Sequence, residues 1–184
     1  MSKKVLIVTG DAVEALEVYY PYYRLLEEGY DVTIAAPKKK KLHTVAHDFT
    51  GWDTFEEKQA YLLEAHAAFA DIDPTQYDAI VIPGGRAPEY IRLDEDLQRI
   101  VRHFFEADKP IAAICHASLI FETMPDLLKG RSLTAYVACK PGVEVMGAKY
   151  VSDSTTHVDK NLVSAHAWPD LPVFMREFLR LLQK

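Results

Sequence analysis

A cysteine followed by a histidine, Cys115 and His116, comes directly after the apolar run 111–114 and is the pair best suited to chemistry. A thiol placed where a buried strand turns into a helix meets unpaired backbone N–H groups, which favour the thiolate. Such a strand–turn–helix is typical of a nucleophile elbow, which exposes the attacking atom on a tight turn. A small buried hydrophobe, the usual state of a free cysteine, is the alternative.

Two other segments carry groups that could serve such a nucleophile. Gly84 and Gly85 follow the apolar run 79–82, and backbone without a Cβ can approach a ligand closely. Their N–H groups and that of His116 could form an oxyanion hole, although Gly-Gly also suits a plain tight turn. Glu17 lies in a largely apolar helical pattern. Beside a thiolate its pKa would rise and it could donate a proton, whereas alone it would be a solvated helix residue.

The elements that must position these residues alternate along the chain. Continuous apolar runs are typical of parallel strands buried on both faces, and here they are separated or followed by helical patterns. The alternation predicts an α/β fold, a doubly wound and mostly parallel sheet with helices on both faces in a three-layer sandwich. Ligands bind such sheets at the carboxyl ends of the strands. The predicted strands are 5–8, 32–36, 79–82 and 110–114, and the predicted helices are 13–28, 94–106 and 171–182.

Residues 37–76 break this alternation, since they are polar and aromatic and contain histidines. We expect a single domain over residues 1–184 with an insert at about 37–76, and a helical stretch near 56–69. A long connection in a compact domain tends to be functional. We also expect Pro21 to kink or interrupt the first helix.

The composition and the missing motifs exclude several classes of function. With 21 Lys and Arg against 27 Asp and Glu, the net charge is −6, which disfavours nucleic acid and anionic membranes as partners. The one basic run, residues 38–41, is typical of a solvated turn. No H-E-x-x-H, paired-cysteine or glycine-rich phosphate motif occurs, so we expect no metal and no cofactor. Two cysteines and no apolar run near 20 residues indicate a cytoplasmic protein with free thiols.

Taken together, the motifs resemble those of the ThiJ/PfpI superfamily. Residues 83–89 (P-G-G-R-A-P-E), 114–116 (I-C-H) and a glutamate four residues before Pro21 carry the resemblance. It implies a flavodoxin-like sandwich with Cys115 as nucleophile and Glu17 hydrogen-bonded to its sulfur. Gly84, Gly85 and His116 would supply the oxyanion amides. The resemblance also implies a homo-oligomer, dimer or hexamer, in which Glu89 of a neighbouring copy orients His116.

Within that superfamily, residues 45–49 (V-A-H-D-F) and the long insert are most similar to the glutathione-independent glyoxalases (glyoxalase III). The resemblance implies conversion of methylglyoxal, a small aldehyde, to lactate without a cofactor. Cys115 would add to the aldehyde and Glu17 would move a proton between carbons. Tyr136 and His47 would line the substrate site, although a structural role suits His47 equally.

Two other functions use the same thiolate, and both stay open at this stage. One is a PfpI-type intracellular peptidase or amidase, and the other is a redox-sensing protective protein. Residues 157–159 (H-V-D) match the His-x-Glu of glutamine amidotransferases poorly, which disfavours that relationship. Ala117 stands where the family often has glycine, so chain packing at the elbow could differ.

Overall fold

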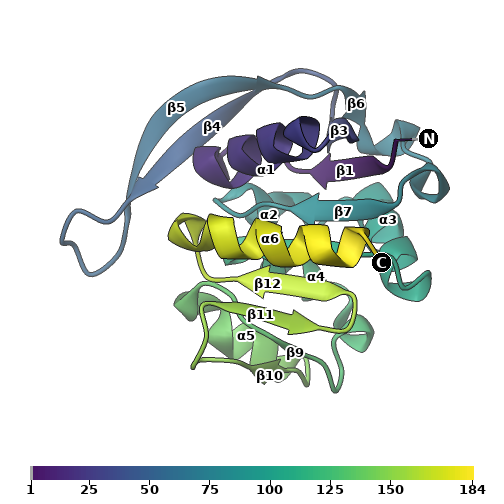
Figure 1. Ribbon diagram of the computed structural model, residues 1–184. Helices are drawn as coiled ribbons and strands as arrows, with labels where there is room; N and C mark the ends of the chain where they lie inside the picture. The colour runs from purple at the N-terminus through teal and green to yellow at the C-terminus, as the bar shows by residue number, and fades with distance from the viewer. Residues whose placement is uncertain (1) are drawn as a thin grey trace.

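The computed structural model, which describes residues 2–184, is built on a seven-stranded sheet in the order β11-β12-β8-β7-β1-β3-β6 (Figure 1). Every neighbouring pair is parallel except β11 with β12. This is the doubly wound α/β sheet that the alternating runs predict, in the flavodoxin-like form that the resemblance implies. The strands are β1 Lys4–Val8, β3 Asp31–Ala36, β6 Ala67–Ala68, β7 Ala79–Ile82, β8 Ile111–Ile114, β11 Thr156–Asp159 and β12 Leu162–Ala165.

Helices cover both faces of this sheet. Helices α1 (Ala15–Glu27) and α6 (Leu171–Leu182) lie side by side in front, and α3 (Glu95–Glu106) and α4 (Ser118–Phe121) lie behind (Figure 1). Two short helices, α2 (Ala87–Ile91) and α5 (Lys140–Val145), complete the set. The 3₁₀ turns are Phe69–Asp71, Pro74–Gln76, Cys115–Ala117, Pro125–Leu127, Val137–Cys139 and Trp168–Asp170. Among residues 2–184, no helix has the length and apolar character needed to cross a membrane.

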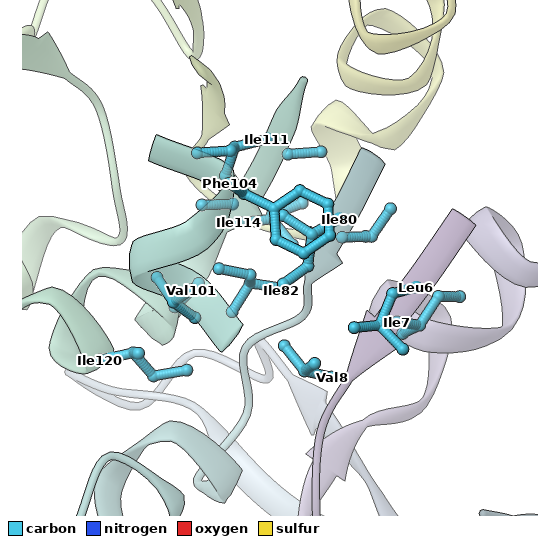
Figure 2. Packing of buried hydrophobic residues seen from close by; sticks show 14 of the residues in the cluster. Leu6, Ile7, Val8, Ile80, Ile82, Val101, Phe104, Ile111, Ile114 and Ile120 are labelled. Atoms are coloured by element: carbon cyan, nitrogen blue, oxygen red, sulfur yellow. The ribbon is translucent and has the colours of Figure 1, made fainter. Parts of the chain in front are cut away.

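The core forms because the central strands are apolar on both faces. All residues of β7, β8 and β12 are buried. Figure 2 shows Val101 and Phe104 of α3 among the side chains of these strands, including Ile80, Ile82 and Ile111. Fully burying one such side chain contributes about 1.5–3 kcal/mol. Strands β7 and β8 are therefore held firmly in the sheet, and the loops at their carboxyl ends start from fixed positions.

The sheet reverses its direction of winding between β1 and β7. From β1 the chain moves outward to β3, then returns past β1 to β7 and continues to β8. Two adjacent loops diverge at such a switch point and leave a crevice at the carboxyl ends of the strands. The β1–α1 loop, the loop after β7 and the turn after β8 all start at this edge.

One expectation about the chain is wrong, and Pro21 does not have one of the two effects expected of it. Residues 56–69 are not helical, because they form β5 (Glu56–Glu64), β6 and a 3₁₀ turn. Strand β5 pairs antiparallel with β4 (Lys41–Asp48), and β4 pairs with β2 (Val13–Glu14). The resulting hairpin extends away from the central sheet (Figure 1). Pro21 does not interrupt α1. A proline removes one backbone hydrogen bond, and the buried side of α1 keeps the helix continuous against the sheet.

Two short strands close the other edge of the molecule. β9 (Ser132–Leu133) pairs parallel with β10 (Lys149–Tyr150). The 3₁₀ turn that follows β9 starts directly after Tyr136, whose backbone N–H donates to the Cys115 carbonyl at 3.2 Å. This bond ties the segment after β9 to the turn that carries Cys115.

Candidate active site

Cys115 occupies a strained turn at the carboxyl end of β8. Its φ is +62°, a left-handed conformation that residues other than glycine rarely adopt, and its side chain is 5% exposed. Such strain costs about 1–3 kcal/mol and concentrates at functional sites. The turn has the strand–turn–helix form that the sequence predicts. However, the helix is short, since the 3₁₀ turn Cys115–Ala117 leads only into the four-residue α4.

Ala117 fits this turn without strain. Its φ and ψ are −54° and −30°, ordinary helical values, and it is fully buried. Alanine adopts that conformation more readily than glycine does. The replacement of the usual glycine therefore leaves the backbone of the elbow unaffected.

Glu17 is brought to the same place by α1. Its side chain is completely buried, and its Oε2 accepts a hydrogen bond from the Gly84 N–H at 2.9 Å. Its Oε1 has no hydrogen-bond partner among residues 2–184, and the carboxyl lies close enough to Cys115 for each group to affect the pKa of the other. The solvated alternative for Glu17 is wrong. The carboxyl group of Glu17 is shielded from solvent and lies beside the side chain of Cys115.

Burial decides the charge state of this pair. Burial, reinforced by the nearby Glu14, raises the pKa of Glu17 to about 8, so its carboxyl keeps a proton at neutral pH. Burial also raises the pKa of the Cys115 thiol, and a charged Glu17 would raise it further, whereas the Gly85 N–H lowers it. Two negative charges are therefore excluded from the pocket. With the proton on Glu17, a charge that develops on the sulfur can be stabilised by a hydrogen bond from the carboxyl.

Glu14 is a second buried carboxyl group in this region. It caps α1, where its Oε2 accepts from the Glu17 N–H at 2.9 Å. Burial raises its pKa, while hydrogen bonds from the backbone of Glu17, His47 and Leu16 act in the opposite direction. No motif in the sequence gives Glu14 a role. Its position shows that it fixes the start of the helix that carries Glu17.

Gly84 and Gly85 pass close to both reactive side chains. A Cβ on Gly84 would lie 2.6 Å from Cys115 Cβ, 2.6 Å from Glu17 Oε2 and 2.9 Å from the His116 nitrogen. Gly85 has a φ of +74° and packs against the backbone of the β1–α1 loop. Because the Gly84 N–H donates to Glu17, it is not free for an oxyanion. Of the three amides predicted for an oxyanion hole, the Gly84 amide therefore has another acceptor, Glu17 Oε2, in this structure.

His116 lies beside Cys115 and against an aromatic ring. Its Nδ1 is 3.1 Å from the Cys115 sulfur, and its ring stacks on that of Tyr136 with centroids 4.8 Å apart. Burial, with the charge of His47 as a second cause, lowers the pKa of His116 to about 4, so the imidazole is neutral at pH 7. Tyr136 therefore lies against His116, and its role as a substrate-lining residue stays a prediction.

The β4–β5 hairpin supplies the opposite wall. His47 is 4% exposed and stacks on Phe55 at a centroid distance of 4.0 Å, and Phe55 meets the rings of His116 and Tyr136 edge-on at 5.9 and 5.7 Å. The resemblance implies a place for His47 in the substrate site, but it implies none for Phe55 or for Glu57, two residues further along the chain. No motif marks them. The only signal was the unusual length of the connection between β3 and β7.

Other candidates stand apart from this site. Glu89 lies on α2 and is exposed. His157 is on the edge strand β11, where its Nε2 pairs with Ser132 Oγ at 2.8 Å, and Asp159 pairs with Arg131 at 2.6 Å. These partners leave no His-x-Glu arrangement beside Cys115. Within residues 2–184, no three His, Cys, Asp or Glu side chains are grouped to hold a metal ion.

The raised pKa of Glu17 predicts a pH-dependent effect on stability. An unfolded glutamate ionises near pH 4.5, whereas this one ionises at about 8. Its contribution to the free energy of unfolding is therefore complete below pH 4.5 and is lost as the pH rises toward 8. We expect Glu17→Gln, which has no charge to lose, to become more stable relative to the unmodified protein over that range. Urea unfolding of both proteins at several pH values measures this difference, and a constant difference would contradict the protonated state of Glu17.

Comparison with known proteins identifies relatives over nearly the whole chain. The sequence profile of the DJ-1/PfpI family matches residues 3–181. A deglycase of Thermococcus kodakarensis is 39% identical over 180 residues, which cover 98% of this chain and 99% of that protein. A protein of Bacillus subtilis named as a candidate cysteine protease, YraA, is 32% identical over 184 residues and 100% of both chains.

Two further similarities extend to longer or more distant proteins. Protein DJ-1 homolog D of Arabidopsis thaliana is 38% identical over 187 residues, and this chain spans 48% of its length. The structure of Drosophila melanogaster DJ-1beta superimposes with a TM-score of 0.83 at 23% identity, covering 100% of this chain and 92% of that one. The second similarity concerns the fold alone.

Proposed function

Because this chain belongs to the DJ-1/PfpI family, with relatives of its own length named deglycases, we propose that it is a cysteine enzyme acting on small α-oxoaldehydes such as methylglyoxal. Cys115 is the nucleophile, Glu17 carries the proton, and no cofactor takes part. The observation that supports this most is the completely buried carboxyl of Glu17 beside the strained Cys115.

The first step is addition of the sulfur to the aldehyde carbon of methylglyoxal. The C–S bond forms, the C=O π electrons move to oxygen, and that oxygen takes the proton of Glu17 to give a hemithioacetal. The N–H groups of Gly85 and His116 stabilise the developing oxyanion. A protonated Glu17 suits this step, because the acid is already in place when the charge develops.

The second step moves hydrogen between carbons. Glu17, now a carboxylate, removes the proton from C1, and the electrons form an enediol with the neighbouring carbonyl. Glu17 passes that proton to the C2 oxygen, then takes the proton of the C1 hydroxyl and delivers it to C2, which gives a lactoyl thioester on Cys115. Water hydrolyses the thioester to lactate and the free thiol. Overall, methylglyoxal and one water become lactic acid. A neutral His116 at the sulfur can take up and release the protons of the hydrolysis.

We also propose that the active enzyme is a homo-oligomer in which Glu89 of a neighbouring copy orients His116. Glu89 supports this because it is exposed on the helix that follows Gly84 and Gly85, where a second copy can reach it. Sedimentation velocity at several protein concentrations distinguishes a stable oligomer from a monomer.

The substrate class is tested by lactate formation from methylglyoxal in the absence of glutathione. Enzymatic determination of lactate measures turnover directly, and a panel of casein and short amide substrates is run in parallel. We expect lactate and no peptide cleavage. Peptide cleavage without lactate would overturn the proposal and favour the peptidase function suggested by the name of the Bacillus subtilis relative.

A further inference from the structure

The hairpin wall of the site is fixed by an ion pair that the proposed mechanism does not use. Arg86 donates from Nε and Nη2 to the two carboxylate oxygens of Glu57, at 2.6 and 2.7 Å. The hydrogen bonds from Arg86 lower the pKa of Glu57 to about 2, so the carboxyl is ionised. Arg86 directly follows Gly84 and Gly85, and Glu57 belongs to β5. The pair therefore ties the hairpin to the loop that holds the catalytic amides.

Glu57 also determines where His47 carries its proton. The Nε2 of His47 lies 3.0 Å from Glu57 Oε2, the oxygen that also accepts from Arg86 Nε. An ionised carboxylate can only accept hydrogen bonds. Nε2 must therefore be the protonated nitrogen, and in the neutral ring Nδ1 has a free lone pair.

That second nitrogen is buried without a partner. Nδ1 of His47 has no hydrogen-bond partner among residues 2–184, and with only 3% of the side chain exposed it is also shielded from solvent. Nearly all buried polar atoms in proteins are paired, and an unpaired one costs about 1–3 kcal/mol. The ring is not loosely held, because it stacks on Phe55, and the Trp168 indole N–H donates to the His47 carbonyl at 3.0 Å. Through Phe55, the His47 ring is connected to His116 and Tyr136 beside Cys115. An oriented, unpaired acceptor at this place suits a ligand that donates a hydrogen bond.

We infer that His47 Nδ1 accepts a hydrogen bond from the hydroxyl of the hemithioacetal and enediol, and that Glu57 and Arg86 are positioning residues that fix the required tautomer. This inference rests on the proposed function. The free aldehyde has two carbonyl oxygens and no hydroxyl, so it has no hydrogen-bond donor for Nδ1. The hydroxyl appears only after Cys115 has added, which makes this a contact to the intermediates alone. Such a contact raises kcat without tightening substrate binding.

Glu57→Gln tests this with almost no change in shape. Arg86 donates to both oxygens of Glu57, so a glutamine must turn its NH₂ group toward either Arg86 or His47. Toward His47 it would donate to Nε2 and transfer the ring proton to Nδ1, the wrong tautomer. We expect kcat for methylglyoxal near pH 7.5 to fall by about tenfold to a hundredfold, with KM changed less than about twofold. His47→Gln keeps a hydrogen-bond donor for Glu57 but has no Nδ1, so we expect the same fall in kcat with a similarly small change in KM.

Lys58→Gln is the matched control. Lys58 is the next residue of the same strand and pairs with Asp48 at 3.1 Å on the exposed side, so its loss should leave kcat unchanged. The rate of Cys115 alkylation by iodoacetamide should be equal in all these variants. Unchanged kcat in Glu57→Gln, a change confined to KM, or an equal loss of alkylation would each overturn the inference, the last because it would indicate a disordered site.

A separate measurement distinguishes failure of this inference from failure of the proposed function. Two-bond ¹⁵N–¹H NMR correlations identify the protonated nitrogen of His47 without any turnover. We expect Nε2–H in the unmodified protein and Nδ1–H in Glu57→Gln. If the unmodified protein forms no lactate, the proposed function fails, and the contact to its intermediates fails with it. If lactate forms but the tautomer does not change, only the inference fails.

Discussion

Replacing Glu17 with glutamine is expected to lower kcat/KM for methylglyoxal by about 10²- to 10⁴-fold, the usual contribution of a general acid or base. Glutamine keeps the shape of the side chain, and its oxygen can still accept from the Gly84 N–H, as Glu17 Oε2 does at 2.9 Å. What it cannot do is release and regain a proton, so it can neither protonate the oxygen during addition nor carry hydrogen between the carbons. Initial rates of lactate formation measure the effect.

The matched control is Glu27→Gln at the other end of the same helix, where the side chain is 76% exposed and pairs with Arg24. Surface pairs of this kind contribute little, so its activity should equal that of the unmodified protein. Cys115 should remain reactive toward iodoacetamide in Glu17→Gln, because the amide can still donate to the sulfur. Full lactate formation by Glu17→Gln would show that another group moves the proton.

Adding a single methyl group at Gly84 is expected to impair both stability and catalysis. The new Cβ would lie 2.6 Å from Cys115 Cβ and from Glu17 Oε2, distances that real Cβ atoms do not tolerate. Overpacking of this kind costs about 1–3 kcal/mol, and a displacement of about 1 Å between reacting groups costs about a hundredfold in rate. We expect Gly84→Ala to lose about that much of kcat/KM and, unlike Glu17→Gln, to slow alkylation of Cys115.

Gly130→Ala separates the catalytic effect of crowding from the general cost of replacing a glycine. Gly130 has a φ of +75° and nothing within 4 Å of its would-be Cβ, so alanine there strains the backbone without touching the site. Its midpoint of urea unfolding should fall while kcat/KM stays the same. Equal activity of Gly84→Ala and the unmodified protein would mean that the close approach of Gly84 does not position Cys115 and Glu17.

The frame of this molecule could be predicted because its central strands are continuous apolar runs. Val5 to Val8 and Ile111 to Ile114 have no polar residue, which distinguishes a buried parallel strand from an exposed one. The same frame places Cys115 beside Gly84, since β8 neighbours β7 in the sheet. That part of the site follows from strand order and the carboxyl-end rule.

The hairpin could not be predicted in the same way. β5 is exposed on most of its length, so it has neither a buried run nor a clear alternation, and its Glu, Lys, Gln, Ala and Leu residues favour a helix. Pairing with β4 overrides that preference. The roles of Phe55 and Glu57 depend on this pairing and on Arg86, more than 25 residues away. No local pattern records such a contact.

The sequence also could not show which group accepts a hydrogen bond from the Gly84 N–H. Gly-Gly predicts backbone that can approach a ligand, but it does not say which neighbour each N–H meets. Only the packing of α1 over the carboxyl end of β7 shows that Glu17 takes the Gly84 N–H. The raised pKa of Glu17 depends in turn on the complete burial of its side chain. The sequence predicts a helix there, but it does not show how deeply Glu17 is buried.

The central claim is that Cys115 forms the covalent intermediate in glutathione-independent conversion of methylglyoxal. The chain contains two free cysteines, both 5% exposed, so Cys139→Ala is a matched control for Cys115→Ala. Lactate formation by the two variants and the unmodified protein tests the claim most directly. The account predicts that Cys139→Ala keeps its activity and that Cys115→Ala forms no lactate. Lactate formation by Cys115→Ala, or none by the unmodified protein, would contradict it.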